Sequence, residues 1–221
     1  MNSSINNGKI HQASHPFEIV QIDHAKLHIT LVDDVSKEPI GQPWLTLAVD
    51  NYSRMIAGYS LSFDPPSETS TAKCVTHAIQ PKNEWLQSKG IVAKWNVSGL
   101  MKTIQANDDV SFSSGKFQDA CIAHGINLDI RSVRQPQDAG YIELILGRIE
   151  KAIRDVSDAT LTLSEFDAYL ATFICNDYHD QLHTSLGMSP TQKWDAGISE
   201  NGVPVFAELN SQFRELAEIS I

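Results

Sequence analysis

The apolar run PWLTLAV at residues 43–49 constrains the fold of this chain more than any other feature. A nearly continuous apolar run of this length is typical of a central strand that is buried on both faces of its sheet. Before it, residues 17–23 alternate apolar and polar side chains, and after it residues 55–63 form another strand-like run. Short turns join the three segments. The sequence therefore predicts an antiparallel meander of three strands.

After the meander, helical and strand patterns alternate. Ser67 is a natural N-cap, and Gly125 is a natural helix-closing residue. The predicted helices cover residues 67–79, a short stretch from Trp85 to Gly90, residues 117–125 and residues 141–156, and the predicted strands cover residues 102–106 and 126–130. The Pro- and Gly-containing stretch 131–140 is predicted to be a loop. This order predicts an α/β domain with a mixed five-stranded sheet and helices on both faces.

Three segments are expected along the 221 residues. Residues 1–15 are rich in Asn, Ser, Gly and His and are predicted to be a disordered leader. Residues 16–160 contain the α/β core, and residues 161–221 are predicted to form a C-terminal helical extension. The hydrophobic content of 42%, without any long apolar run, indicates a globular protein that does not enter a membrane.

The three cysteines, Cys74, Cys121 and Cys175, are far apart and lie in apolar helical patterns. Their odd number, without CxxC or Cys/His spacing, argues against a zinc site. We expect buried, reduced thiols, which fit a cytoplasmic protein.

The net charge of −10 bears on any nucleic-acid function. Affinity for duplex DNA comes largely from Lys and Arg side chains that neutralise phosphates. A chain with this charge that acts on DNA must confine its positive charge to one face, receive it from other domains, or bind DNA weakly when alone.

Several blocks of sequence occur in an order and at spacings typical of one family. The blocks are QID at 21–23, GQPWLTLAVDNYSRMIAGY at 41–59, PPSETS at 65–70, IQANDDVSF at 104–112, ACIAHGINL at 120–128, RQPQDAGYIE at 134–143 and YHDQLHTSLGMSPTQKW at 178–194. On these blocks, residues 16–197 resemble the retroviral-integrase-like transposase catalytic core, a member of the ribonuclease-H-like superfamily. The likeness is greatest to transposases of the Tn7 and Mu type.

The resemblance implies DNA strand cleavage and strand transfer at a site of three carboxylates. In the family, two divalent ions activate a water or a 3′-hydroxyl, and Mg²⁺ or Mn²⁺ in this role requires oxygen ligands. The implied substrates are transposon ends and target DNA. The implied partners are other transposition proteins, flanking DNA-binding domains and further copies of the chain in a homo-oligomer.

Asp23 matches the first carboxylate of the family and Glu143 matches the third. Asp23 ends an apolar strand, where a buried acid is unfavourable without a cation or a partner, and an ordinary strand-end aspartate is the alternative. Glu143 is placed in the first turn of the helix at 141–156. The helix dipole alone also favours an acidic residue there.

The middle position departs from the family pattern, which is Asp-Asn-Gly, two residues and then Phe. Counted back from Phe112, the Asp position falls on Asn107, the Asn on Asp108 and the Gly on Asp109. Asn carries no charge, so it is a poor ligand between two Mg²⁺ ions. Asp108 could reach the metals only if the strand ends or bulges there, because neighbouring strand residues point to opposite faces. Either the site is inactive or Asp108 joins the two outer carboxylates as a metal ligand.

Basic residues around Glu143 are the candidates for contact with DNA phosphates. They are Arg131 and Arg134 in the predicted loop, and Arg148, Lys151 and Arg154 on the predicted helix. Glu150 and Asp155 dilute the helical set, so a solvated face of mixed charge is the alternative. Leu144 also stands where the transposase relatives usually carry Arg.

Other polar groups are predicted to be structural. His179 and His183 have the i, i+4 spacing of a metal pair, but the resemblance implies a structural motif there. His24 is expected to have a surface or structural role, with contact to the metal site or DNA as the alternative. Asp50 and Arg54 are expected to form a turn contact.

Three functions remain open on the sequence. The first is a transposase core that cleaves and joins DNA strands. The second is a non-catalytic ribonuclease-H-like domain that serves as a DNA-scaffolding or protein-interaction module, which Asn107 and the net charge of −10 favour. The third is a ribonuclease-H-type nuclease. The block at 178–194 argues against the third, because that extension belongs with transposases.

Overall fold

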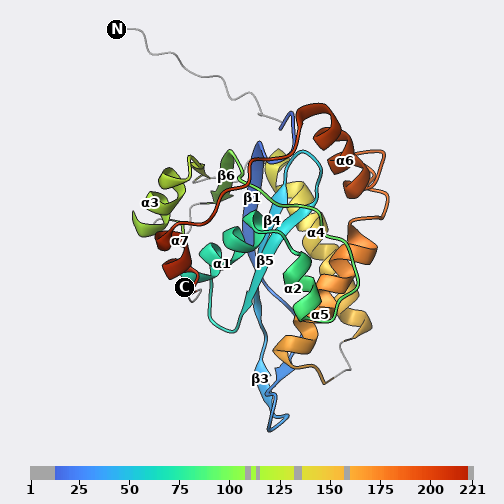
Figure 1. The fold of residues 1–221 in the computed structure, drawn as a ribbon. Helices are drawn as coiled ribbons and strands as arrows, with labels where there is room; N and C mark the ends of the chain where they lie inside the picture. Colours follow the sequence, from blue (N-terminus) through green and yellow to red (C-terminus); the bar gives the residue numbers. More distant parts are fainter. Residues whose placement is uncertain (1–12, 108–110, 113–114, 132–135, 157–159, 219–221) are drawn as a thin grey trace.

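A five-stranded sheet in the order β5-β4-β1-β6-β7 forms the centre of the molecule (Figure 1). The computed structural model describes residues 13–107, 111–112, 115–131, 136–156 and 160–218, with side chains except at 136–141. Most of the predicted leader, residues 1–12, lies outside this description. The strands of the sheet are β1 (Ile19–Lys26), β4 (Trp44–Asp50), β5 (Ile56–Ser62), β6 (Thr103–Asn107) and β7 (Asn127–Arg131). The predicted mixed sheet of five strands is confirmed.

Strand directions confirm the predicted meander. β1 is antiparallel to β4 and β4 is antiparallel to β5, whereas β6 is parallel to both β1 and β7. The parallel strands β1, β6 and β7 therefore end at the same edge of the sheet. The long apolar run of the sequence becomes β4, in which every residue after Trp44 is buried.

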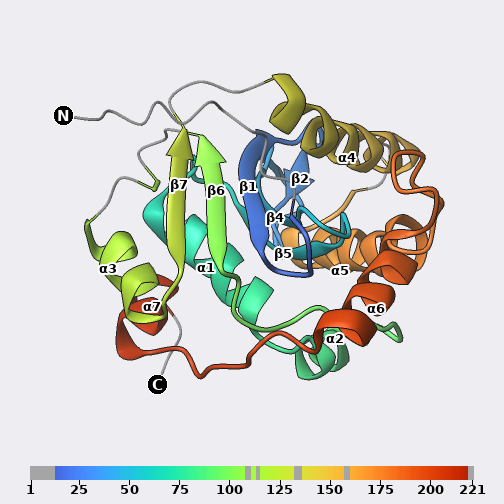
Figure 2. The same cartoon turned by 90° about the horizontal axis from the view of Figure 1, so that it is seen from above.

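Helices cover both faces of the sheet, as predicted. Gly58 of β5 faces α1 (Glu68–Ile79) so closely that a Cβ there would lie 2.5 Å from the backbone nitrogen of Ala78. The next residue, Tyr59, points the other way, and its hydroxyl donates to Asp167 Oδ1 of α5 (Leu163–Phe173) at 2.6 Å. Figure 2 shows α4 (Pro136–Asp155) on the same side of the sheet as α5, and α1 on the opposite side.

The remaining elements surround this framework. They are the two-stranded ribbon of β2 (Leu31–Val32) and β3 (Pro39–Gly41), the helices α2 (Asn83–Ser88), α3 (Gly115–Ala123), α6 (Pro190–Asn201) and α7 (Ser211–Leu216), and the π-helix η1 (Ile174–Tyr178). Ser67, Thr162 and Ser189 each close a capping box at a helix start. No helix in the described ranges is both long and apolar enough to cross a bilayer.

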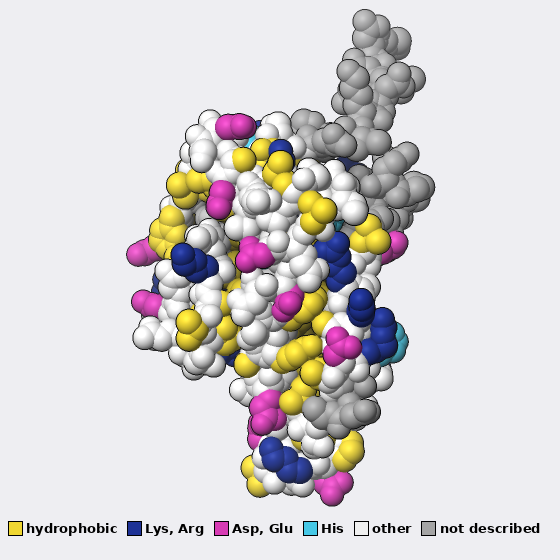
Figure 3. Space-filling view, turned by 90° about the vertical axis from the view of Figure 1, so that its right-hand side faces the viewer, with side chains coloured by type: hydrophobic (Ala, Val, Ile, Leu, Met, Phe, Trp, Pro, Cys, Tyr) yellow, Lys and Arg dark blue, Asp and Glu magenta, His cyan; other side chains and the backbone are white. Residues whose placement is uncertain are grey.

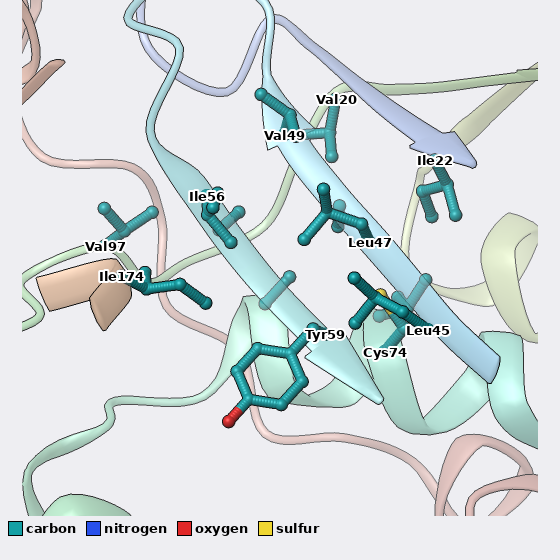
Figure 4. Packing of buried hydrophobic residues seen from close by; sticks show 14 of the residues in the cluster. Val20, Ile22, Leu45, Leu47, Val49, Ile56, Tyr59, Cys74, Val97 and Ile174 are labelled. Carbon is teal, nitrogen blue, oxygen red and sulfur yellow. The ribbon is translucent and has the colours of Figure 1, made fainter. Parts of the chain in front are cut away.

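The buried core is centred on the strands β1, β4 and β5. Its most enclosed side chains, each at most 1% exposed, include Val20, Ile22, Leu45, Leu47, Val49 and Ile56 (Figure 4). All three cysteines are buried and free, as predicted. Burial raises the pKa of the Cys121 and Cys175 thiols to about 12, so both remain protonated at neutral pH.

The predicted loop at residues 131–140 is wrong at both ends. Arg131 is the last residue of β7, and α4 begins at Pro136. Proline is favourable in the first turn of a helix, because its missing N–H would have no partner there and its φ is already helical. Glu143 is consequently the eighth residue of α4 and not a first-turn residue. The explanation that the helix dipole favours an acidic residue at this position is therefore wrong.

A strap, residues 202–210, connects α6 to α7 across the molecule (Figure 2). Leu100 donates its N–H to the carbonyl of Val205 at 2.7 Å, which fixes the strap to the chain before β6. At its far end α7 packs against α1 and α3, and Phe213 is fully buried with its ring 6.1 Å from that of Phe117.

Candidate active site

The parallel register of β1 and β6 brings Asp23 and Asn107 side by side. Ile22 pairs with Ala106, and Asp23 and Asn107 are the next residues of their strands. In-register residues of neighbouring strands point to the same face, and such strands lie about 4.8 Å apart. Asp23 is 8% exposed, and Asn107 is half-buried. The first carboxylate position and the Asn thus form one row at the carboxyl edge of the sheet.

Arg131 extends this row on β7, where it pairs with Asn107. Its guanidinium donates to Asp129 Oδ2 from Nη2 at 2.8 Å and from Nε at 3.0 Å. Partial burial alone would raise the pKa of Asp129, but the hydrogen bonds from Arg131 and Gln105 outweigh burial and hold that pKa below its ordinary value. The row therefore runs from an acidic through a neutral to a basic side chain.

Glu143 lies on α4, on the side of the sheet to which this row points. Asp23 is in register with Leu47 and Leu47 with Tyr59, whose hydroxyl reaches α5, so Asp23 points to the α4–α5 side of the sheet. On α4, Ile142 is buried against the core and Glu143 is exposed. Figure 2 shows α4 beginning near the edge where β6 and β7 end.

Asp108 and Arg134 lie outside the described residues, and Asn107 is the candidate second ligand that the structure describes. Among the residues that are described, no group of three or more His, Cys, Asp or Glu side chains is close enough to hold a metal ion. Asp23 and Glu143 are thus the two carboxylates of the predicted set whose positions are known.

Two residues of this region were not singled out from the sequence, Gln21 and Gln105. They pair with each other in the β1–β6 ladder, one row before Asp23 and Asn107. Both are buried, at 7% and 5% exposure, and the Oε1 atom of each has no hydrogen-bond partner within the described ranges. The signal that could have found them is their spacing of two residues from Asp23 and Asn107, because residues two apart in a strand share a face.

A family model describing the TnsB C-terminal domain matches residues 21–158, which span both carboxylates and the Asn between them. The chain belongs to the TnsB C-terminal domain family. Its resemblance to the catalytic cores of transposases is thereby confirmed.

A curated relative of this TnsB-type domain is the transposase for transposon Tn552 from Staphylococcus aureus. The two are 30% identical over 198 residues, which is 85% of this chain and 39% of the relative. The chain therefore spans well under half the length of that transposase.

Solved structures share the fold of the TnsB-type domain at low sequence identity. A chain of the simian T-cell lymphotropic virus intasome, in complex with the PP2A regulatory subunit B56 gamma, has a TM-score of 0.61 and 18% identity over 92% of this chain and 62% of its own. The BIV integrase catalytic core has a TM-score of 0.54 and 12% identity, and the match covers 83% of this chain and 97% of that core. The HTLV-2 integrase core in complex with magnesium has a TM-score of 0.53 and 14% identity, and the match covers 81% of this chain and 97% of that core. These likenesses confirm the predicted integrase-type, ribonuclease-H-like fold.

The basic residues on α4 of the TnsB-type domain do not share one environment. Lys151 and Arg154 are exposed and follow Glu143 at spacings that place them on its side of the helix. Arg148 is half-buried, and its guanidinium lies 5.7 Å from the ring centre of Tyr178. Figure 3 shows basic side chains gathered on one flank of the surface that bears α4 and α5, with acidic side chains among them.

His24 ties the segment after Asn107 to the sheet. Its Nδ1 lies 2.9 Å from Thr46 Oγ1 on β4, and its Nε2 lies 3.0 Å from Ser111 Oγ. It follows Asp23 on the strand and therefore points to the opposite face. These contacts support the structural role that was expected.

The other predicted structural groups of the TnsB-type domain are held by backbone contacts. His179 Nε2 accepts from the N–H of Ile56 at 3.1 Å, and burial lowers the pKa of His179 to about 3, so it is neutral. The Arg54 N–H donates to the Asp50 carbonyl at 2.9 Å, which is the expected turn contact.

Proposed function

We propose that this domain is the catalytic core of a DNA transposase, which cleaves transposon ends and joins them to target DNA with Mg²⁺ or Mn²⁺, and that Asn107 limits its activity. One observation carries the proposal. Asp23 and Asn107 stand in one row at the carboxyl edge of the parallel strands, and Glu143 lies on the helix over the same face.

The residues at this edge fit a divalent ion with one carboxylate too few. Asp23 and Glu143 supply charged oxygen ligands, Asn107 supplies a neutral amide oxygen, and Asp108 is the candidate to restore the charge. The unpartnered oxygens of Gln21 and Gln105 add to the acceptor character of the site. Two bound ions would activate the attacking water or 3′-hydroxyl and stabilise the leaving oxygen.

The domain's own residues would orient DNA rather than supply most of its affinity. We assign phosphate contacts to Arg131, Arg134, Arg148, Lys151 and Arg154. Because the net charge is −10, further affinity must come from flanking DNA-binding segments, other transposition proteins or further copies of the chain. In this proposal residues 16–160 form the catalytic core, residues 161–221 a helical extension and residues 1–15 a leader.

Asn107→Asp tests the proposal directly. The added charge should tighten Mg²⁺ binding at least about tenfold, because a unit charge about 4 Å from a cation contributes several kcal/mol even at an effective dielectric of about 20. Calorimetric titration of the chain, of Asn107→Asp and of Asp23→Asn measures this. Asp23→Asn should abolish binding, and Asp64→Asn at an exposed turn is the matched control.

A DNA strand-joining assay with the flanking domains present completes the test. Asn107→Asp should join strands faster than the unmodified protein. If the unmodified protein binds two ions and joins strands as fast as the variant, Asn107 does not limit the activity.

The second candidate is a non-catalytic module that scaffolds DNA or partner proteins. The neutral Asn107 in the row and the net charge of −10 favour it. It is supported if Asn107→Asp restores metal binding and neither protein joins DNA strands.

A further inference from the structure

A second polar row lies directly beneath the row of Asp23, Asn107 and Arg131. Gln21 pairs with Gln105, and Gln105 pairs with Asp129, on the same three parallel strands. Each residue is two positions before its counterpart in the upper row, so all six side chains share one face of the sheet. Two buried neutral amides in one row are unusual on a sheet whose opposite face carries Ile22, Ala106 and Ile130.

The two amides leave two acceptors without donors. Gln21 Oε1 and Gln105 Oε1 are both buried and have no hydrogen-bond partner in the described part of the chain. The amide of Gln105 is oriented by its neighbour, because its Nε2 donates to Asp129 Oδ2 at 3.2 Å. Its Oε1 consequently points away from Asp129. Asp129 is in turn fixed by Arg131. Buried acceptors without a donor are destabilising and are rare in folded proteins, so a matched pair needs an explanation.

We propose that Gln21 and Gln105 together hold one metal-bound water, which donates one O–H to each Oε1 beneath a divalent ion carried by Asp23. The inference rests on the proposed function only in taking an ion at Asp23 as given. A water has two donors, and the row offers two acceptors. A metal-bound water keeps its oxygen on the ion, so both of its hydrogens are available to the protein.

The spacing of the two rows suits this arrangement. Rows two residues apart on a strand are about 6.6 Å apart. A Mg²⁺–oxygen bond of about 2.1 Å on each side of the ion, followed by a hydrogen bond of about 2.8 Å, spans about 7 Å. Mg²⁺ usually keeps several waters and binds proteins through one or two carboxylates. In this chain the glutamines would hold the hydrated ion where Asn107 provides no charge.

A plain amide ladder across the strands is the competing explanation. A rotation of the Gln21 side chain could let its Nε2 donate to Gln105 Oε1, which would serve the fold and need no ion. The two explanations differ in what substitution does. An amide ladder stabilises the metal-free protein. Two glutamines that hold a metal-bound water stabilise the metal-bound protein, and their oxygens are unsatisfied when the ion is absent.

The test uses Gln21→Met and Gln105→Met, which keep the length of the side chain and remove its amide. Gln87→Met, at an exposed position of α2, is the matched control. Mg²⁺ affinity is measured by calorimetry, and the melting temperature of the metal-free protein is measured in EDTA. Each row variant should lose about tenfold or more in Mg²⁺ affinity, as outer-shell substitutions generally do, and should melt no lower than the parent. The control should change neither value.

Two results would overturn the inference, and they are distinguishable. If the row variants keep their Mg²⁺ affinity and melt lower, the glutamines form a ladder, and the proposed metal site stands as long as Asp23→Asn abolishes binding. If neither the parent chain nor Asn107→Asp binds Mg²⁺, the proposed function fails together with the inference.

Discussion

Asp50 joins three parts of the chain through one buried carboxylate. Its Oδ1 accepts from the N–H of Phe17 at 2.9 Å, and its Oδ2 accepts from the N–H and the hydroxyl of Ser53 at 2.9 and 2.6 Å. Burial raises the pKa of this carboxyl, and the hydrogen bonds oppose that rise. The residue therefore fixes the entry into β1 against the turn between β4 and β5.

Asp50→Ala should destabilise the fold by about 3 kcal/mol, because it leaves buried N–H groups of Phe17 and Ser53 without an acceptor. Asp50→Asn keeps one amide oxygen and should lose about half as much. Urea unfolding at pH 7 gives both values, with the exposed Asp64→Asn as the control. Equal midpoints for the parent and Asp50→Ala would show that these hydrogen bonds contribute nothing.

At the residue scale, a motif marks positions in the sequence, and the register shows which of them are neighbours in the sheet. The count back from Phe112 led to Asn107, and its row with Asp23 follows from the register. Gln21 and Gln105 were missed because alternating polar residues in a strand ordinarily face solvent. In the folded domain both are buried.

The helix α4 carries Glu143, Gly147, Lys151 and Arg154 at successive spacings of four, four and three residues. Packing does not require a glycine at position 147, because a Cβ there would meet nothing within 4 Å. It therefore weakens the helix next to the proposed site.

Gly147→Ala should stabilise the protein by roughly 0.5–1 kcal/mol, the difference in helix propensity between Gly and Ala. Gly58→Ala is the opposite case, because its Cβ would lie 2.5 Å from the backbone of α1 and should destabilise by about 1–3 kcal/mol. Thermal and urea unfolding of both variants check this. A loss of stability in Gly147→Ala would mean that α4 is distorted at that point.

At the element scale, caps and periodicity were the reliable signals. Ser67 starts α1 as expected, because its side chain accepts a backbone N–H group. The start of α4 was misplaced because Pro and Gly were interpreted as loop residues. The short α7 and the π-helix η1 were missed, since neither gives a periodic pattern long enough to detect.

Across the whole molecule, burial rather than ion pairing sets the charge state of the interior. Burial lowers the pKa of His77 and His179 to about 3, from an ordinary value of 6.5. It also holds the pKa of Lys82 well below its ordinary value. These three groups therefore lose their charge more readily in the folded protein than they do in water.

Stability should therefore fall as the pH drops from 7 to 5. Between pH 6.5 and 3 the unfolded chain binds protons at His77 and His179 that the folded chain does not, which costs about 2 kcal/mol per histidine by pH 5. The raised pKa of Asp50 acts in the opposite sense and offsets part of this loss. Urea unfolding at both pH values gives the loss of stability between pH 7 and pH 5, and His179→Gln should reduce this loss by about 2 kcal/mol. An equal loss in parent and variant would contradict the assignment.

The strap and α7 have a consequence for synthesis on the ribosome. Phe213 completes the environment of Phe117 on α3, yet it is made almost a hundred residues later. The strands of the meander and α1 are synthesised close together in time and can pack early. The packing of α3, which follows β6 and precedes β7, is completed only after residues 209–217 have been synthesised. Nascent chains generally fold in units as they emerge. The part of the domain that contains α3 is thus the last to be completed, and a chaperone has its longest access there.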